Sequence, residues 1–136
     1  MLFPALDVST SGLEAQRVRM NARSSNIANI STTRNEEGQP EPYRPRFVVL
    51  ETDDTVGAHG GVGVRVASVE TAEVEPRWRW EPGHPDANDR GYVAYPNVSM
   101  MTEFTDAMEA ARAYEANLGA IEITKDLEQQ TLRILA

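Results

Sequence analysis

The stretch from Met100 to Ile121, "MMTEFTDAMEAARAYEANLGAI", decides the fold. Its apolar residues recur at alternating spacings of four and three, which is the pattern of a helix that packs lengthwise on a partner helix. The pattern predicts a helix from about residue 97 onward, roughly 55 Å long at 1.5 Å per residue, with Asn97 or Ser99 as its N-cap. The stripe comprises Met100, Phe104, Ala107, Ala111, Tyr114, Leu118 and Ile121, and it resumes at Leu132 and Leu135.

A second long helix is predicted near the other end of the chain, from about Pro4 to Asn29. The apolar residues of its stripe recur every seven positions, so the stripe is thin. Thr10, Ser11 and Gly12 are weak helix formers, and we expect them to loosen the first half of this helix. The stripe residues are Leu6, Leu13, Met20 and Ile27.

The two helices are expected to pack on each other as an antiparallel pair, because each has a stripe to bury and the middle of the chain is too small to cover both. Residues 1–33 contain three basic and two acidic residues, a net charge of +1, whereas residues 97–136 contain three basic and seven acidic residues, a net charge of −4. These opposite signs favour the pairing. The many alanines of the last helix leave another interpretation open, namely close packing on several sides in a bundle of several chains.

Between the helices lies a segment rich in proline and glycine. Its stretches "YRPRFVVLE" (43–51), "GGVGVRVASVE" (60–70) and "EVEPRWRWE" (73–81) have the β-branched and alternating composition of strands. We predict a single small antiparallel sheet or open barrel of about three to five strands. The fold class is therefore α+β: long N- and C-terminal helices paired as a coiled-coil-like layer, with a small antiparallel β-rich middle domain. The predicted division is 1–33, 34–96 and 97–136.

Composition narrows the classes of function. The chain has 136 residues, 40% of them hydrophobic and 25% charged, as expected for one folded domain. Its net charge of −8 argues against nucleic acid as a partner, because phosphate binding needs a basic surface. It contains no cysteine, which excludes disulfides and thiolate chemistry. No apolar run is long enough to span a bilayer, and the N-terminal residues lack the features of a cleavable signal peptide.

The sequence predicts no catalytic, cofactor or metal site. His84 stands near Asp86 and Asp89, but one histidine with scattered acids in a loop lacks the ligand spacing of a metal site. Hydrogen bonds within a turn are the favoured interpretation. Trp78 and Trp80 have two interpretations, a half-buried strand or, less commonly, an exposed contact face.

Three stretches together resemble a known family. They are "SNIANISTTR" (25–34), "GHPDANDRGYVAYPNV" (83–98) and "ARAYEAN" (111–117). In this order they are similar to the flagellar axial rod and hook protein family of bacteria, and within it to the proximal rod proteins of the basal body. Arg77, Trp78 and Trp80 do not match the family pattern.

The resemblance implies a structural, non-enzymatic subunit of the proximal rod, the torque-transmitting shaft of the basal body. It implies export through the flagellar export apparatus without signal cleavage, and a final place in the rod within the periplasmic space. The implied partners are other proximal and distal rod proteins, the rod-to-ring adaptor protein, the membrane ring and further copies of the chain. No cofactor is implied. The terminal helices would line the inside of a tube and the β-rich middle would face outward.

The resemblance also suggests why "RMNARSSNIANISTTR" (19–34) mixes isoleucines with asparagine, serine and threonine, which weaken helices. We expect the first helix to end here, with the amides of Asn26 and Asn29 binding the free carbonyl groups of its last turn. Replacing both asparagines by alanine would then leave the stability of the monomer nearly unchanged and abolish motility. An ordinary helix cap is the alternative.

The residues expected to act in assembly and helix packing are Leu6, Leu13, Met20, Asn26, Ile27, Asn29, Met100, Phe104, Tyr114, Leu118 and Ile121. Two other functions stay open at this point. One is a cytoplasmic coiled-coil adaptor or export chaperone, and the other is a small metal-binding protein or enzyme that uses His84, Asp86 and Asp89.

Overall fold

The computed structural model describes residues 3–57 and 60–136; residues 1–2, the start of the predicted segment 1–33, lie outside them. Two long helices enclose four strands in the chain order, which confirms the predicted α+β class. The helix bounds agree with the sequence prediction to within a few residues. The elements are α1 (Phe3–Ala28), β1 (Arg46–Gly57), β2 (Gly61–Thr71), β3 (Arg77–Trp80), β4 (Tyr92–Tyr95) and α2 (Met100–Leu135).

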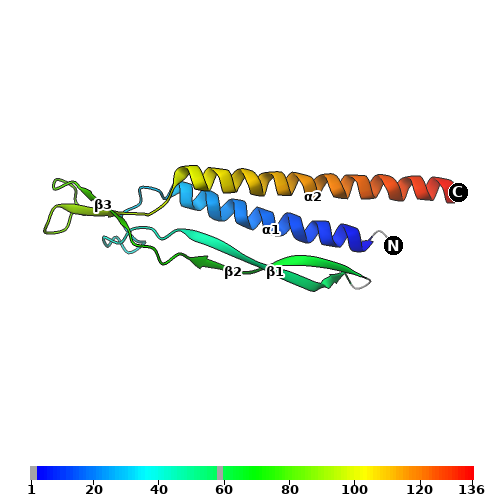
Figure 1. Cartoon of the computed structure of the whole chain (residues 1–136), viewed down its shortest axis with the longest axis horizontal. Coiled ribbons are helices and arrows are strands. Elements are labelled where there is room, and N and C mark those ends of the chain that lie inside the picture. Colours follow the sequence, from blue (N-terminus) through cyan, green and yellow to red (C-terminus); the bar gives the residue numbers. More distant parts are fainter. Residues whose placement is uncertain (1–2, 58–59) are drawn as a thin grey trace.

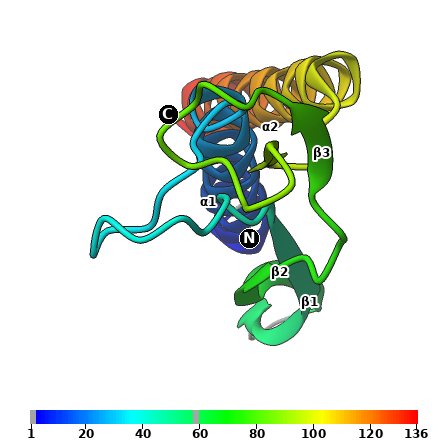
Figure 2. The ribbon, with the colours of Figure 1, turned by 90° about the vertical axis from the view of Figure 1, so that its left-hand side faces the viewer.

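The molecule has three layers. α1 runs antiparallel to α2, and the hairpin of β1 and β2 lies along the other side of α1 (Figures 1 and 2). α1 contacts all three of these elements, whereas α2 makes no comparable contact with a strand in the described part of the chain. α2 also extends past the start of α1 (Figure 1). One helix therefore occupies the centre of the molecule, and the other is covered on one side only.

Small residues allow α1 and α2 to approach closely. Ala15 and Ala22 of α1 are buried, as is Ala110 of α2. A Cβ atom built on Gly12 would lie 2.7 Å from Oδ1 of Asn117 on α2. The expectation that this part of α1 is loosened is wrong: the helix is continuous, and its glycine serves the close approach of the two helices.

The neighbouring serine is used in the same way. The hydroxyl of Ser11 donates to the carbonyl of Val8 at 2.7 Å and accepts from the backbone N–H of Val64 in β2 at 3.1 Å. Residues that weaken an isolated helix thus join α1 to its two neighbours.

The side of α2 that faces α1 is not centred on the predicted apolar stripe. Glu103 and Ala110 are its buried residues, whereas Met100, Phe104 and Leu118 of the predicted stripe remain 46%, 51% and 43% exposed. Because each residue turns a helix by about 100°, residues such as Glu103 and Phe104 point in clearly different directions. Within one chain, α2 turns small and polar side chains toward α1 and leaves larger apolar ones uncovered.

The strands form two separate two-stranded antiparallel sheets, so the prediction of a single sheet or barrel is wrong. β1 and β2 pair over most of their length, with a register shift between Val49 and Leu50. β3 and β4 pair at the other end of the molecule (Figure 1). Pro76 separates the sheets, because a residue without an N–H group cannot extend the ladder from β2 into β3. No helix in the described ranges is long and apolar enough to cross a bilayer.

A junction and the surfaces it positions

The side chain of Asn26 connects three parts of the chain near the end of α1. It is fully buried, and its Nδ2 donates to the carbonyl of Arg46 at 2.8 Å and to Oε2 of Glu103 at 3.1 Å. Its Oδ1 accepts from the hydroxyl of Tyr43 at 2.9 Å and from the N–H of Arg46 at 2.7 Å. All four hydrogen-bonding positions of the amide are thus occupied. We call Asn26, Tyr43, Arg46 and Glu103 the junction.

The predicted role of Asn26 in binding the last carbonyl groups of α1 is therefore wrong. Asn29 does have that role, since its Nδ2 donates to the carbonyl of Ser25 at 2.9 Å. The hydroxyl of Thr32 in turn donates to Oδ1 of Asn29 at 3.0 Å. The two asparagines look alike in sequence, but one closes the helix end and the other joins α1 to β1 and α2.

Ion pairs reinforce the junction. Nη1 of Arg23 lies 3.2 Å from Oε2 of Glu103, and Nη2 of the same arginine lies 3.1 Å from Oδ2 of Asp106. These contacts confirm that the basic N-terminal helix pairs with the acidic C-terminal one. The start of α2 is held by Ser99, the N-cap, whose hydroxyl faces the N–H of Thr102.

The loop between β3 and β4 is attached to the segment after α1 through Asp86. Its carboxylate, which is almost fully buried, accepts from the hydroxyl of Thr33 and from Nε of Arg34, both at 2.8 Å. The hydrogen bond from Thr33 and the charge of Arg34 hold the pKa of Asp86 below its usual range. Nδ1 of His84 accepts from the backbone N–H of Asp86 at 3.0 Å. These side chains serve local structure, and no group of three possible metal ligands occurs within residues 3–57 and 60–136.

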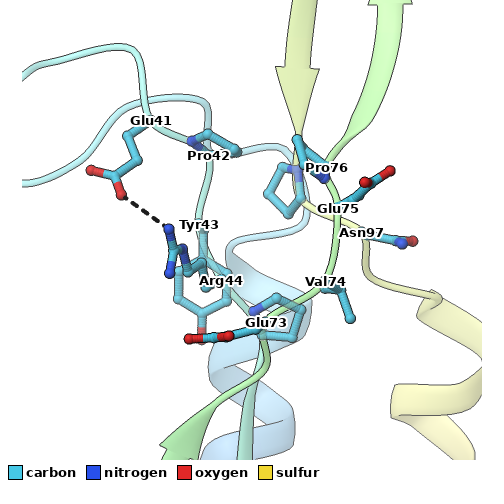
Figure 3. Close-up of a pocket in the computed structure, with 11 residues that line it drawn as sticks. Glu41, Pro42, Tyr43, Arg44, Glu73, Val74, Glu75, Pro76 and Asn97 are labelled. Atoms are coloured by element: carbon cyan, nitrogen blue, oxygen red, sulfur yellow. Dashed lines mark ion pairs between the residues drawn. The ribbon is translucent and has the colours of Figure 1, made fainter.

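A groove of about 530 Å³ lies beside the junction, between the chain before β1 and the linker before β3 (Figure 3). Prolines and three glutamates line it, and Arg44 lies 3.8 Å from Glu41 across its edge. Tyr43 is part of its wall, and burial raises the pKa of this phenol, so that its hydroxyl is protonated and donates to Asn26 at neutral pH. The lining residues include no nucleophile paired with a base.

The predicted assembly residues fall into three groups. Asn26 and Asn29 shape the end of α1. Leu6, Leu13, Met20 and Ile27 on α1, with Tyr114 and Ile121 on α2, are half-buried within the chain. The third group remains largely exposed along α2, where other large apolar side chains join it. This exposed set comprises Met100, Met101, Phe104, Met108, Leu118, Ile123, Leu127, Leu132, Ile134 and Leu135.

Sequence reasoning missed most partners of Asn26. The acidic start of α2 was noted as favourable for the helix dipole, but nothing indicated that Glu103 would be buried against Arg23. Tyr43 and Arg46 lie almost twenty residues from Asn26, and no periodic pattern connects them. A buried amide with four partners is visible only once the chain is folded.

Comparisons with known proteins agree with this architecture. A family model described as "Flagella basal body rod protein" matches residues 6–34, which include α1 from Leu6 and the segment that follows it. A second, "Flagellar basal body rod FlgEFG protein C-terminal", matches residues 89–134, which include β4 and most of α2. The two matches thus cover the elements joined by Asn26, Arg23 and Glu103.

Similar full-length proteins carry one name, "Flagellar basal-body rod protein FlgC". The relative from Borreliella burgdorferi is 36% identical, and the alignment covers 98% of this chain and 97% of the relative. The relative from Bacillus subtilis is 37% identical over 97% of both chains. The relative from Salmonella typhimurium is 37% identical, with 98% and 97% covered. The chain belongs to the FlgC family of flagellar basal-body rod proteins.

Proposed function

We propose that this chain is a structural subunit of the proximal rod, where it assembles with copies of itself and with other rod proteins into a shaft that transmits torque. The observation that carries the proposal is the exposed apolar side of α2. A single chain leaves the large side chains of the C-terminal helix uncovered, although the junction holds that helix firmly on α1. Contiguous exposed apolar surface of this kind marks an interaction site.

The division 1–33, 34–96 and 97–136 fits this role. We assign the helical segments to an inner layer of the rod and the strands to an outer layer. The contact of β1 and β2 with the side of α1 opposite α2 supports the assignment, because it separates a helical side of the molecule from a β side.

The assembly residues are assigned by their exposure. Met100, Phe104 and Leu118 contact neighbouring subunits, whereas the half-buried residues on α1 and the two asparagines keep the helices in the geometry that presents those contacts. The proposed neighbours are other proximal and distal rod proteins, the rod-to-ring adaptor protein and the membrane ring. The proposed location is the rod within the periplasmic space, reached through the flagellar export apparatus without signal cleavage. No enzymatic activity is part of the proposal.

Charge substitutions on the exposed side of α2 test this function. Phe104→Asp combined with Leu118→Asp should leave the melting temperature of the purified chain nearly unchanged, because both side chains are about half exposed. In a strain that lacks its own copy, incorporation into isolated basal bodies should fall by roughly tenfold or more, as when a contact worth about 2 kcal/mol is lost.

Thr105→Asp is the matched control, since it places the same charge at an exposed position on another side of the same helix. It should enter basal bodies normally. Normal incorporation and swimming of the Phe104→Asp, Leu118→Asp variant would overturn the proposed function. If the purified chain were instead found bound to another flagellar protein in the cytoplasm, the adaptor alternative would replace it.

A further inference from the structure

We propose that an aromatic face on the β3–β4 hairpin docks the last turns of α2 from a second copy of this chain, so that copies join head to tail. This inference rests on the proposed function, because it presupposes a subunit that assembles with itself. It adds two surfaces of defined chemistry that lie at opposite ends of the molecule.

The aromatic face consists of Trp78, Trp80 and Tyr92. Trp80 pairs directly with Tyr92 across the hairpin, and Trp78 pairs with Ala94, so their side chains lie on one side of the two strands. The alternate residue Val93 is completely buried, which shows that the other side of the hairpin faces the molecule. Trp78 and Trp80 are 57% and 66% exposed. Of the two interpretations of this pair, the half-buried strand is wrong and the exposed face holds.

A groove of about 740 Å³ begins at the aromatic face and reaches the start of α2. Trp78, Ile30 and Met100 supply its apolar wall, and Arg77 and Arg79 are its charged residues, with no carboxylate among the residues that line it. Met100 also belongs to the exposed apolar side of α2, so the groove continues a surface already proposed to contact other subunits. The site therefore suits an apolar segment that carries negative charge.

The end of α2 has those properties. We call residues 122–135 the tail. It contains three acidic and two basic residues, and its apolar side chains have no cover within the chain. Leu132 and Leu135 are 62% and 78% exposed, although they continue the side of α2 that faces α1 nearer its start. They are uncovered because α2 has 36 residues and α1 only 26.

The positions of the two surfaces decide the kind of contact. The β3–β4 hairpin and the end of α2 lie at opposite ends of the elongated molecule (Figure 1). The tail of a chain therefore cannot reach its own aromatic face, and the contact must be made between copies. Since the two surfaces differ, the interface is heterologous and leaves one free surface at each end of a pair, which permits further addition.

Two variants separate the surfaces. A groove variant carries Trp78→Ala and Trp80→Ala, and a tail variant carries Leu132→Asp and Leu135→Asp. All four side chains are more than half exposed, so both variants should keep the circular dichroism and melting temperature of the unmodified chain. If either double variant loses its fold, the single changes Trp80→Ala and Leu135→Asp replace it.

Intrinsic fluorescence reports the docking directly, because Trp78 and Trp80 are the only tryptophans of the chain. In a mixture of the variants, all tryptophan emission comes from the tail variant, whose aromatic face is intact. Adding the groove variant, whose tail is intact, should shift that emission to shorter wavelength and saturate at one to one. Sedimentation should show that each variant alone is a monomer, that the mixture stops at a dimer, and that the unmodified chain forms longer species with rising concentration.

A chain that carries all four changes is the control, and adding it should leave the emission unchanged. The proposal is overturned if the mixture shows no shift and no dimer. It is also overturned if the tail variant alone associates as well as the unmodified chain, because the aromatic faces would then pair with each other. Basal-body incorporation of the Phe104→Asp, Leu118→Asp variant tests the proposed function separately: that function can hold while the head-to-tail contact fails.

Discussion

At the scale of single residues, Asn26 shows how one side chain can hold distant segments together. Replacing it by alanine would leave the N–H and carbonyl of Arg46, the hydroxyl of Tyr43 and part of the Glu103 carboxylate without their partner. We expect Asn26→Ala to lower the free energy of unfolding by about 3 kcal/mol, because buried polar groups would lose their hydrogen bonds. Urea unfolding followed by circular dichroism measures the difference.

Asn29→Ala is the matched control and should cost about 1 kcal/mol or less, since Asn29 is only half-buried and acts at a helix end. Equal effects of the two substitutions would contradict the assigned roles. The expectation from sequence that the monomer tolerates both changes is thus retained for Asn29 and abandoned for Asn26.

The carboxylate of Asp86 gives the chain a local dependence on pH. Its pKa is lowered in the folded chain, mainly by the hydroxyl of Thr33, so its ionised form stabilises the fold. That contribution is fully present above the pKa of the unfolded chain, about 4, and is lost as the pH falls through the lower folded value. The stability difference between the unmodified chain and Asp86→Asn should therefore be constant from neutral pH to about 5 and shrink below about 4.

Melting temperatures across this pH range check the prediction. Asp89→Asn, in the same loop, is the control, and its difference from the unmodified chain should not follow the same pH course. A difference for Asp86→Asn that grows on acidification would show that the carboxylate is not stabilised in its ionised form.

At the scale of elements, the closeness of α1 and α2 depends on Gly12. Gly12→Ala would bring a methyl group within 3 Å of the amide of Asn117, which is itself held by a hydrogen bond to the carbonyl of Ala113. We expect a loss of about 1 kcal/mol of stability, because the cost of overpacking exceeds the gain in helix propensity. Gly119→Ala meets no atom within 4 Å and should instead gain about 1 kcal/mol.

Chemical denaturation of the two variants decides between packing and propensity. If Gly12→Ala gained as much stability as Gly119→Ala, the helices would not be in close contact at this position.

The helices themselves could be predicted from sequence because a period near 3.6 is a local property of the chain. Ser99 could be named as one of two caps for the same reason. The side of α2 that faces α1 could not be predicted, because the strongest apolar stripe is not the one used within the chain. Glu103 and Ala110 are buried since Arg23, Asn26 and the small residues of α1 lie opposite them, and such a match involves residues about eighty positions apart. The division into two sheets was likewise missed, because pairing between strands is not a local property.

At the scale of the whole molecule, the three-layer arrangement predicts a gradient of protection along α2. The backbone near Ala110 lies against α1, whereas residues 131–135 are exposed and lie where α2 extends past α1. In the dilute chain, amide hydrogens of 131–135 should exchange much faster than those near Ala110, because helix ends without tertiary contacts open readily. Adding rod partners should slow the exchange of 131–135 selectively.

Equal protection of both regions in the dilute chain would show that α2 is already covered along its whole length, and it would remove the reason to expect neighbours there. Mass spectrometry of peptides from each region provides the measurement.

The unequal lengths of the helices have a mechanical consequence. α2 exceeds α1 by ten residues, about 15 Å of helix at 1.5 Å per residue. Subunits with such a step cannot be stacked like flat discs; they must be laid like bricks in overlapping courses. In a shaft built this way, no flat seam crosses the wall between one level and the next, so a twisting load cannot shear the shaft along a single plane of weak contacts.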